Sequence, residues 1–354
     1  MKKLLVLLPS VLLYFLFIVL IDPNFLFSSE DEKIAQSIVD GNSVFVYKKV
    51  ETYRNLKKCI IERMPKNTEC VVVGPSTSLV FDSQSAGSSS FYNLSITHGS
   101  FQDTLAILGI LEANDVNYKK LILNLDNFFF DSKADKYANT EFIKPYADYM
   151  SSLVLNGNGD KSRAHSDYSA LVSNKVDALF SVSYFQESWR YLSSRKLHAL
   201  TRRWGIVDSG FHGDDFSYDQ NAAIFYPKKA VEKTEQDVID YVSTFDIEGV
   251  FSFGSHISTE RVQFFDSLVA YLKSRGREVE LVLVPLPPVM WDKVSEKSDC
   301  YVLDEVSKVM EKTRERYGLV LHGSLNPYKC GVVNADFYDA RHIRRESLHK
   351  LFTK

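Results

Sequence analysis

The sequence lacks the patterns that most often mark a metal enzyme. Its eight histidines are scattered along 354 residues, and no HExxH or CxxC spacing occurs. We therefore expect neither a metal ion nor another cofactor. A basic excess is also absent, because the formal net charge is −3, so nucleic acid is not an expected partner. No internal repeat or low-complexity tract stands out, and the composition is that of an ordinary globular protein.

Cysteine is scarce, with only Cys59, Cys70, Cys300 and Cys330 in the chain. An oxidising compartment would permit Cys59–Cys70 and Cys300–Cys330 disulfides. Free thiols in or near the core are an equally good interpretation, since spacing alone does not assign pairing.

One long apolar run is present, and it lies at the N-terminus. Lys2 and Lys3 precede an almost entirely apolar stretch from residue 4 to residue 21, about the length that crosses a bilayer as a helix. A cleaved signal peptide is the alternative, but no small-x-small cleavage site follows the run. We favour an uncleaved transmembrane signal anchor over residues 1–22, with residues 23–66 as a connecting segment. For a bacterial source, this predicts a single-pass protein of the cytoplasmic (inner) membrane whose catalytic domain is extracytoplasmic.

Beyond the connecting segment, short β-branched runs alternate with helical patterns. Strands are predicted at residues 69–73, 91–96, 120–125, 279–284 and 319–321, and helices at 102–114, 259–275, 302–317 and 342–352. This alternation predicts an α/β fold with a parallel sheet over residues 67–354. The stretch from about 133 to 245 breaks the rhythm. We interpret it as an insertion or cap on the sheet, with helices around 164–200 and a long loop at 203–218.

A serine lies where the first strand of this domain ends. Val71-Val72-Val73 runs into Gly74-Pro75-Ser76-Thr77, which reads as a strand followed by a tight turn. Open α/β folds bind their ligands at the carboxyl ends of such strands. Ser76 is therefore a candidate nucleophile, although a serine in this place is also a common turn or helix-capping residue.

A carboxylate precedes a histidine by three residues near the C-terminus, in Asp339-Ala340-Arg341-His342. With Ser76 these two residues supply the parts of a serine hydrolase: a nucleophile, a base in His342, and an orienting carboxylate in Asp339. A loop carboxylate beside a capping histidine is the structural alternative. Asp336 is a second carboxylate, available to cap the turn instead.

In their order and spacing these segments resemble the SGNH, or GDSL-like, hydrolase superfamily. The resembling blocks are residues 74–77, 93–99, 125–127 and 339–342. The resemblance implies a flavodoxin-like three-layer α/β/α sandwich with a parallel sheet. It also implies a Ser76–His342–Asp339 triad, with Gly99 and Asn127 as donors to the oxyanion.

A further resemblance is to membrane-anchored SGNH-like proteins of bacterial envelopes, carried by His322-Gly323-Ser324-Leu325-Asn326-Pro327 and Asp336-Phe337-Tyr338-Asp339. It implies an esterase or O-acyltransferase acting on an acylated cell-envelope polysaccharide or teichoic acid, in some cases beside a membrane-bound O-acyltransferase partner. Two alternatives stay open. One is a non-catalytic SGNH-like module that binds polysaccharide or scaffolds an export complex. The other is a lipid esterase, suggested by the anchor and the aromatic residues 128–130.

Overall fold

A five-stranded parallel sheet forms the centre of the computed structural model, which describes residues 2–47, 53–131, 144–165, 175–195, 203–246, 257–295 and 301–352. The strand order is β3-β2-β4-β8-β9, and all four pairings are parallel. The strands are β2 (Asn67–Val73), β3 (Phe91–Asn93), β4 (Asn117–Asn124), β8 (Glu278–Leu283) and β9 (Val320–Gly323). The predicted mixed α/β fold with a parallel sheet is confirmed.

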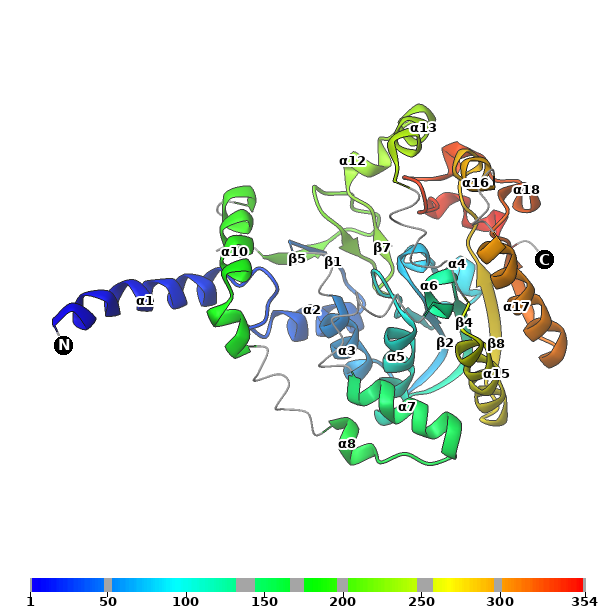
Figure 1. Cartoon of the computed structure of the whole chain (residues 1–354), viewed down its shortest axis with the longest axis horizontal. Helices are drawn as coiled ribbons and strands as arrows, with labels where there is room; N and C mark the ends of the chain where they lie inside the picture. The colour runs from blue at the N-terminus through cyan, green and yellow to red at the C-terminus, as the bar shows by residue number, and fades with distance from the viewer. Residues whose placement is uncertain are drawn as a thin grey trace.

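The inner strands are apolar because helices cover them. Cys70 to Val73 in β2 and Leu121 to Leu123 in β4 are fully or almost fully buried, as parallel strands in such folds generally are. Helices α3 (Tyr53–Arg63), α5 (Phe101–Ala113), α7 (Lys144–Asn156) and α15 (Thr259–Ser274) lie together beside the sheet, and α17 (Tyr301–Tyr317) packs against α15 and β9 (Figure 1).

The strand order changes direction at β2. From β2 the chain moves outward to β3, and α5 then returns it to β4 on the other side of β2. Crevices outside the carboxyl ends of the strands at such a point are where open α/β sheets bind ligands. A ligand-binding site is therefore expected at the carboxyl ends of β2 and β4.

A second, antiparallel sheet joins two distant parts of the chain. Its order is β5-β1-β6-β7, formed by β1 (Ser43–Val46), β5 (Trp204–Val207), β6 (Ser217–Tyr218) and β7 (Ile224–Phe225). The long loop predicted at 203–218 is therefore wrong at its two ends, which are strands. Because β1 belongs to the segment 23–66, this sheet ties that segment to the middle of the chain.

The described structure also contains further helices and turns. They are α2 (Glu30–Val39), α4 (Ser83–Ala86), α6 (Asn127–Phe130), α8 (Lys161–His165), α10 (Val182–Arg195), α12 (Lys228–Val231), α13 (Glu235–Thr244), α16 (Pro288–Ser295) and α18 (Pro327–Cys330), with 3-10 turns at Ser76–Ser78, Asn334–Asp336 and Arg345–Lys350. The last helix predicted at 342–352 is wrong. An isolated bridge between Phe337 and Ile343 and the 3-10 turn occupy this part instead.

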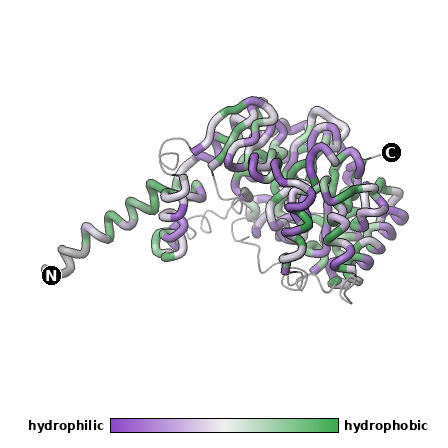
Figure 2. The backbone as a smooth tube through the Cα atoms, turned by 90° about the horizontal axis from the view of Figure 1, so that it is seen from above, coloured by the Kyte–Doolittle hydropathy of each residue, from purple (hydrophilic) through white to green (hydrophobic). Residues whose placement is uncertain are grey.

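Helix α1 (Lys2–Ile21) projects from the body of the molecule, and Figure 2 colours most of it as hydrophobic. It meets α10 where it ends, and there the Tyr184 hydroxyl donates to Asp22 Oδ1 at 2.8 Å. Among helices whose side chains are described, none is both long and apolar enough to cross a membrane. The side chains of α1 are described only from Leu8 onward, so this finding does not cover the first side chains of the predicted anchor.

Two buried basic side chains connect α3 to the main sheet and its helices. Arg54 makes a two-pronged ion pair with Asp103 at 2.7 and 2.8 Å, beside the start of α5. Lys57 is completely buried and donates to the carbonyl oxygens of Asn93 and Ala222 at 2.6 and 2.8 Å. Through these contacts the segment before β2 supports the carboxyl ends of the strands.

The described cysteines carry free thiols. Cys59 and Cys70 are buried and unpaired, and Cys330 is half-buried and unpaired. The Cys59–Cys70 disulfide is therefore not formed, and the free-thiol interpretation holds for this pair. Because Cys330 carries a free thiol, the Cys300–Cys330 disulfide is not formed either; Cys300 itself lies outside the described residues.

Candidate active site

Ser76 lies directly after β2, as the first residue of a three-residue 3-10 turn. The turn is tight enough to require glycine before it. A Cβ on Gly74 would lie 2.6 Å from the Ser78 hydroxyl and 2.8 Å from Asn124 Cβ at the end of β4. A larger residue at 74 would therefore displace the turn that carries Ser76.

Asn93 holds the loop that follows this turn. It is completely buried, and its side-chain amide donates to the carbonyl oxygens of Ser78, Leu79 and Phe81 at 2.8, 3.1 and 3.0 Å. Because Lys57 in turn donates to the Asn93 carbonyl, the loop is fixed by a buried polar network. The sequence pattern marked Asn93 only as the first residue of a block, and this supporting role was not predicted.

The structure brings Ser76, His342 and Asp339 together. His342 Nε2 lies 2.9 Å from Ser76 Oγ, and His342 Nδ1 lies 2.9 Å from both carboxylate oxygens of Asp339. Ser76 and His342 are separated by 266 positions in the chain. The distances are those expected of a nucleophile, its base and an orienting group.

The charge of Asp339 defines which nitrogen of His342 carries the proton. Burial acts to raise the pKa of Asp339. The adjacent His342 and the backbone N–H groups of Arg341 and His342 outweigh that effect and hold this pKa well below its usual range. An ionised carboxylate only accepts hydrogen bonds, so Nδ1 is the donor. In the neutral ring Nε2 is then an acceptor and receives the Ser76 hydroxyl.

Asp336 serves a different purpose from Asp339. One of its oxygens accepts from the Val333 N–H at 2.7 Å and pairs with Lys350 at 2.6 Å, and the other accepts from the Ser347 hydroxyl at 2.7 Å. These bonds cap the turn at residues 334–336 and tie it to the C-terminal segment. Of the two carboxylates weighed from the sequence, Asp339 is the one that contacts His342.

Gly99 approaches the turn of Ser76, but its N–H is engaged. A Cβ on Gly99 would lie 3.1 Å from Pro75 Cα and 3.2 Å from the Gly74 carbonyl oxygen. The Gly99 N–H donates to the Ile96 carbonyl at 3.2 Å. The residue therefore lies where the sequence placed it, while the donor expected to face an oxyanion is used within its own loop.

Asn127, the second oxyanion donor expected from the sequence, has a side-chain nitrogen that is not engaged. It follows β4 as the first residue of α6 and is 3% exposed. Its side-chain nitrogen is buried and has no hydrogen-bond partner in the described structure. An unpaired buried donor of this kind costs about 1–3 kcal/mol. This nitrogen is therefore available to donate to an acceptor that binds near the end of β4.

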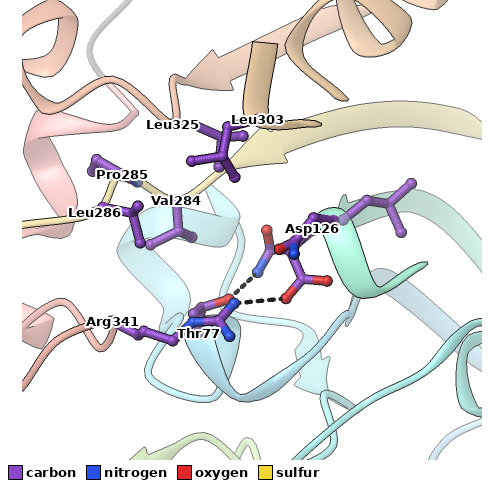
Figure 3. Close-up of a pocket in the computed structure, with 11 residues that line it drawn as sticks. Thr77, Asp126, Val284, Pro285, Leu286, Leu303, Leu325 and Arg341 are labelled. Atoms are coloured by element: carbon purple, nitrogen blue, oxygen red, sulfur yellow. Dashed lines mark hydrogen bonds and ion pairs between the residues drawn. The ribbon is translucent and has the colours of Figure 1, made fainter. Parts of the chain in front are cut away.

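An ion pair links the segment of Asn127 to that of His342. Arg341 donates to Asp126 at 3.1 Å, and its guanidinium lies 4.8 Å from the centre of the Phe128 ring. Figure 3 shows this pair with Thr77 beside it and with leucine, valine and proline side chains on the other side of the pocket that they line. The Thr77 hydroxyl accepts a hydrogen bond of 2.8 Å from the Asn124 side chain. The ion pair holds the two loops together across the strand ends, a contact that the sequence did not predict.

An aromatic stack backs His342. Tyr226, from the middle of the chain, is 7% exposed, and its ring centre lies 5.9 Å from that of His342 and 4.3 Å from that of Tyr338. These rings limit the motion of the imidazole. No local pattern around Tyr226 signals the contact.

No group of three or more histidine, cysteine, aspartate or glutamate side chains suited to a metal occurs within the described ranges. The contacts among Ser76, His342 and Asp339 would allow nucleophilic chemistry assisted by a base. A scan of the chain against known protein families found no match, and a search of curated proteins found none either.

Proposed function

We propose that this protein performs serine-dependent acyl ester chemistry, as an esterase or an O-acyltransferase. The observation that carries the proposal is the continuous contact from Ser76 through His342 to Asp339, with 2.9 Å at each step. It lies at the carboxyl ends of the sheet beside the point where the strand order changes. If the protein did not use these three groups for chemistry, its fold would have brought them together from distant parts of the chain, in this order and place, without any use for them.

In the first half-reaction, Ser76 Oγ attacks the carbonyl carbon of an ester while its proton passes to His342 Nε2. The tetrahedral adduct collapses, the ester C–O bond breaks, and the leaving alcohol takes the proton from His342. Asp339 stabilises the imidazolium that forms in between. In the second half-reaction, water or a sugar hydroxyl gives its proton to His342 and attacks the acyl carbon. The bond from that carbon to Ser76 Oγ then breaks, and Ser76 Oγ takes the proton from His342.

The oxyanion of each tetrahedral adduct needs positioned donors. We assign this role to Asn127 Nδ2, which is buried and without a partner, together with the backbone N–H of Ser76. The Gly99 N–H, expected as a donor from the sequence, would have to release the Ile96 carbonyl first. Asn127 therefore becomes the principal side-chain donor in this proposal.

The proposed family is the SGNH-like superfamily. The strand order β3-β2-β4-β8-β9 corresponds to 2-1-3-4-5, which is that of flavodoxin-like folds, and this supports the three-layer sandwich that the resemblance implies. The envelope-protein resemblance further suggests an acylated glycan or an acyl-donating membrane partner. We accordingly place the protein at the cytoplasmic membrane, held by residues 1–22, with its site on the extracytoplasmic side.

The proposal is tested by mass spectrometry of surface glycans from cells that carry the wild type, Ser76→Ala or Ser83→Ala. Ser83 is exposed on α4 and is a matched control. Loss of O-acyl groups with Ser76→Ala identifies a transferase, and their accumulation identifies an esterase. Unchanged glycans with Ser76→Ala, and full complementation by that variant, would favour the non-catalytic scaffold. Activity on lipid esters alone would favour the lipid esterase.

A further inference from the structure

A second cavity, of about 520 Å³, lies apart from the Ser76 turn. Three parts of the chain line it: the start of α4 with Asp82 and Gln84, the stretch from His212 through β7 to Val231, and the C-terminal segment from residue 338 to residue 352. Its volume is in the range of small-molecule sites. Neither Ser76, His342 nor Asp339 lines it.

The cavity combines an apolar surface with flat polar groups. Ile224, Leu348 and Phe352 are among its apolar lining residues. The Arg345 guanidinium lies 3.9 Å from the centre of the Phe225 ring. The His212 ring contacts the same phenylalanine edge-on, with 5.4 Å between the two ring centres. Such a surface suits a ligand with apolar C–H faces and polar edges.

The charges at the cavity do not favour an anion. Asp82 and Glu346 are acidic, and Arg345 is the one lining residue with a permanent positive charge. Arg345 is already paired with Asp219 at 3.0 Å. A phosphate or carboxylate ligand would therefore meet two carboxylates and a cation whose charge is already balanced.

The two histidines of the lining add acceptors. His212 Nδ1 lies 2.7 Å from the Tyr226 carbonyl oxygen, and His349 Nδ1 lies 2.8 Å from that of Glu346. A carbonyl only accepts, so Nδ1 is the donor in both rings, and in the neutral ring Nε2 is left as an acceptor. With the two carboxylates, the cavity is rich in acceptors and suits a ligand that carries many O–H donors.

We propose that this cavity is a binding site for a neutral oligosaccharide. A sugar residue supplies the two features that the lining requires, apolar C–H faces for the aromatic and aliphatic surface and hydroxyl donors for the acceptors. The site binds the glycan chain away from the reactive serine. This binding depends on the cavity alone, and only its coupling to acyl transfer depends on the proposed function.

The cavity is close enough to the proposed active site to serve the same polymer. Tyr338 lines the cavity and stacks on Tyr226, whose ring lies 5.9 Å from that of His342. Two aromatic rings therefore separate the glycan site from the catalytic base. A polysaccharide bound in the cavity would keep a neighbouring sugar at the site of acylation.

The test measures binding of fluorescently labelled tetrasaccharides to the full chain by fluorescence polarisation. The probes are maltotetraose and the N-acetylglucosamine tetramer, both neutral, and tetragalacturonate as the anionic comparison. The double variant Gln84→Ala/Glu346→Ala removes two exposed lining groups, and Glu235→Ala/Gln236→Ala makes the same changes on α13, outside the cavity. Labelling of Ser76 by a fluorophosphonate is recorded for every variant.

We expect at least one neutral probe to bind the wild type and the α13 variant equally, and to bind the cavity variant at least tenfold more weakly. Ser76 labelling should be the same in all three. The proposal is overturned if neither neutral probe binds, if the cavity variant binds as well as the wild type, or if the anionic probe binds best. Glycan binding that persists without Ser76 labelling would reject the proposed chemistry and support the cavity.

Discussion

Replacing Asp339 by asparagine tests the orientation of the proposed base with the least change in shape. In the wild type, Asp339 Oδ1 accepts from the N–H groups of Arg341 and His342 at 2.9 and 3.0 Å, and the carboxylate also accepts from His342 Nδ1. An asparagine oxygen can retain the two backbone bonds. Its NH₂ group then faces Nδ1, and Nδ1 must become the acceptor.

The consequence falls on Ser76. With Nδ1 as acceptor, the neutral His342 ring carries its proton on Nε2, 2.9 Å from Ser76 Oγ. That nitrogen can no longer take the serine proton. In serine proteases the wrong tautomer costs about 10⁴-fold in kcat, which corresponds to about 5.5 kcal/mol of activation free energy. We expect a loss of this size in Asp339→Asn, because the two backbone bonds preserve the loop.

The assay is hydrolysis of p-nitrophenyl acetate, with thermal unfolding measured on the same samples. Asp336→Asn is the matched control. It is the same substitution three residues earlier, and the Asp336 carboxylate contacts Val333, Ser347 and Lys350 rather than His342. It should lower the unfolding free energy by about 1–3 kcal/mol and keep most of the activity of the folded protein. The reasoning is refuted if folded Asp339→Asn retains more than a tenth of wild-type activity, or if both variants lose activity equally.

Three further predictions concern the oxyanion, the turn and a buried lysine. Asn127→Ala should lower kcat for the same ester by about 10²–10³-fold with the fold retained; an unchanged kcat would remove this residue from the oxyanion site. Gly74→Ala should lower the unfolding free energy by about 1–3 kcal/mol, because its Cβ would meet Ser78 and Asn124; equal melting temperatures would contradict this. Burial, partly opposed by a nearby aspartate, lowers the pKa of Lys57 to about 7, whereas the unfolded chain keeps the proton to about pH 10.4. Between these two pH values the unfolded state binds more protons than the folded state. As the pH rises through this range, the unfolding free energy of the wild type should therefore increase relative to that of Lys57→Met, by up to about 1.4 kcal/mol per pH unit. Denaturant unfolding at pH 7 and 9 that shows no such increase would contradict this.

The sequence predicted the parts of the fold that depend on local patterns. The runs that became β2, β4 and β8 are apolar over consecutive residues because both faces of the sheet are covered. The helices α5, α15 and α17 show apolar residues at helical spacing, and their predicted bounds agree with the structure to within one residue at every end. These signals lie within one element and need no knowledge of its partners.

What the sequence did not predict depends on contacts between distant residues. The second sheet pairs Ser43 with Val207, and its strands are too short to give a periodic signal. The Asp126–Arg341 pair spans 215 positions.

The candidate site was likewise predicted where local patterns identify it and not where folded contacts decide it. The strand-turn motif and the Asp339–His342 spacing identified Ser76, His342 and Asp339, which the structure brings together. That the Gly99 N–H is engaged could not have been predicted from the sequence, because its bond to the Ile96 carbonyl is a property of the folded loop.

The most direct test of the central claim is covalent labelling of Ser76 by a fluorophosphonate, read by mass spectrometry of the peptide that contains it. A serine activated by His342 should be phosphonylated in the folded wild type. Labelling should be abolished in Ser76→Ala, slowed by orders of magnitude in His342→Ala, and unchanged in Ser83→Ala. A folded wild-type protein that is never labelled at Ser76, or is labelled equally well without His342, would contradict the account.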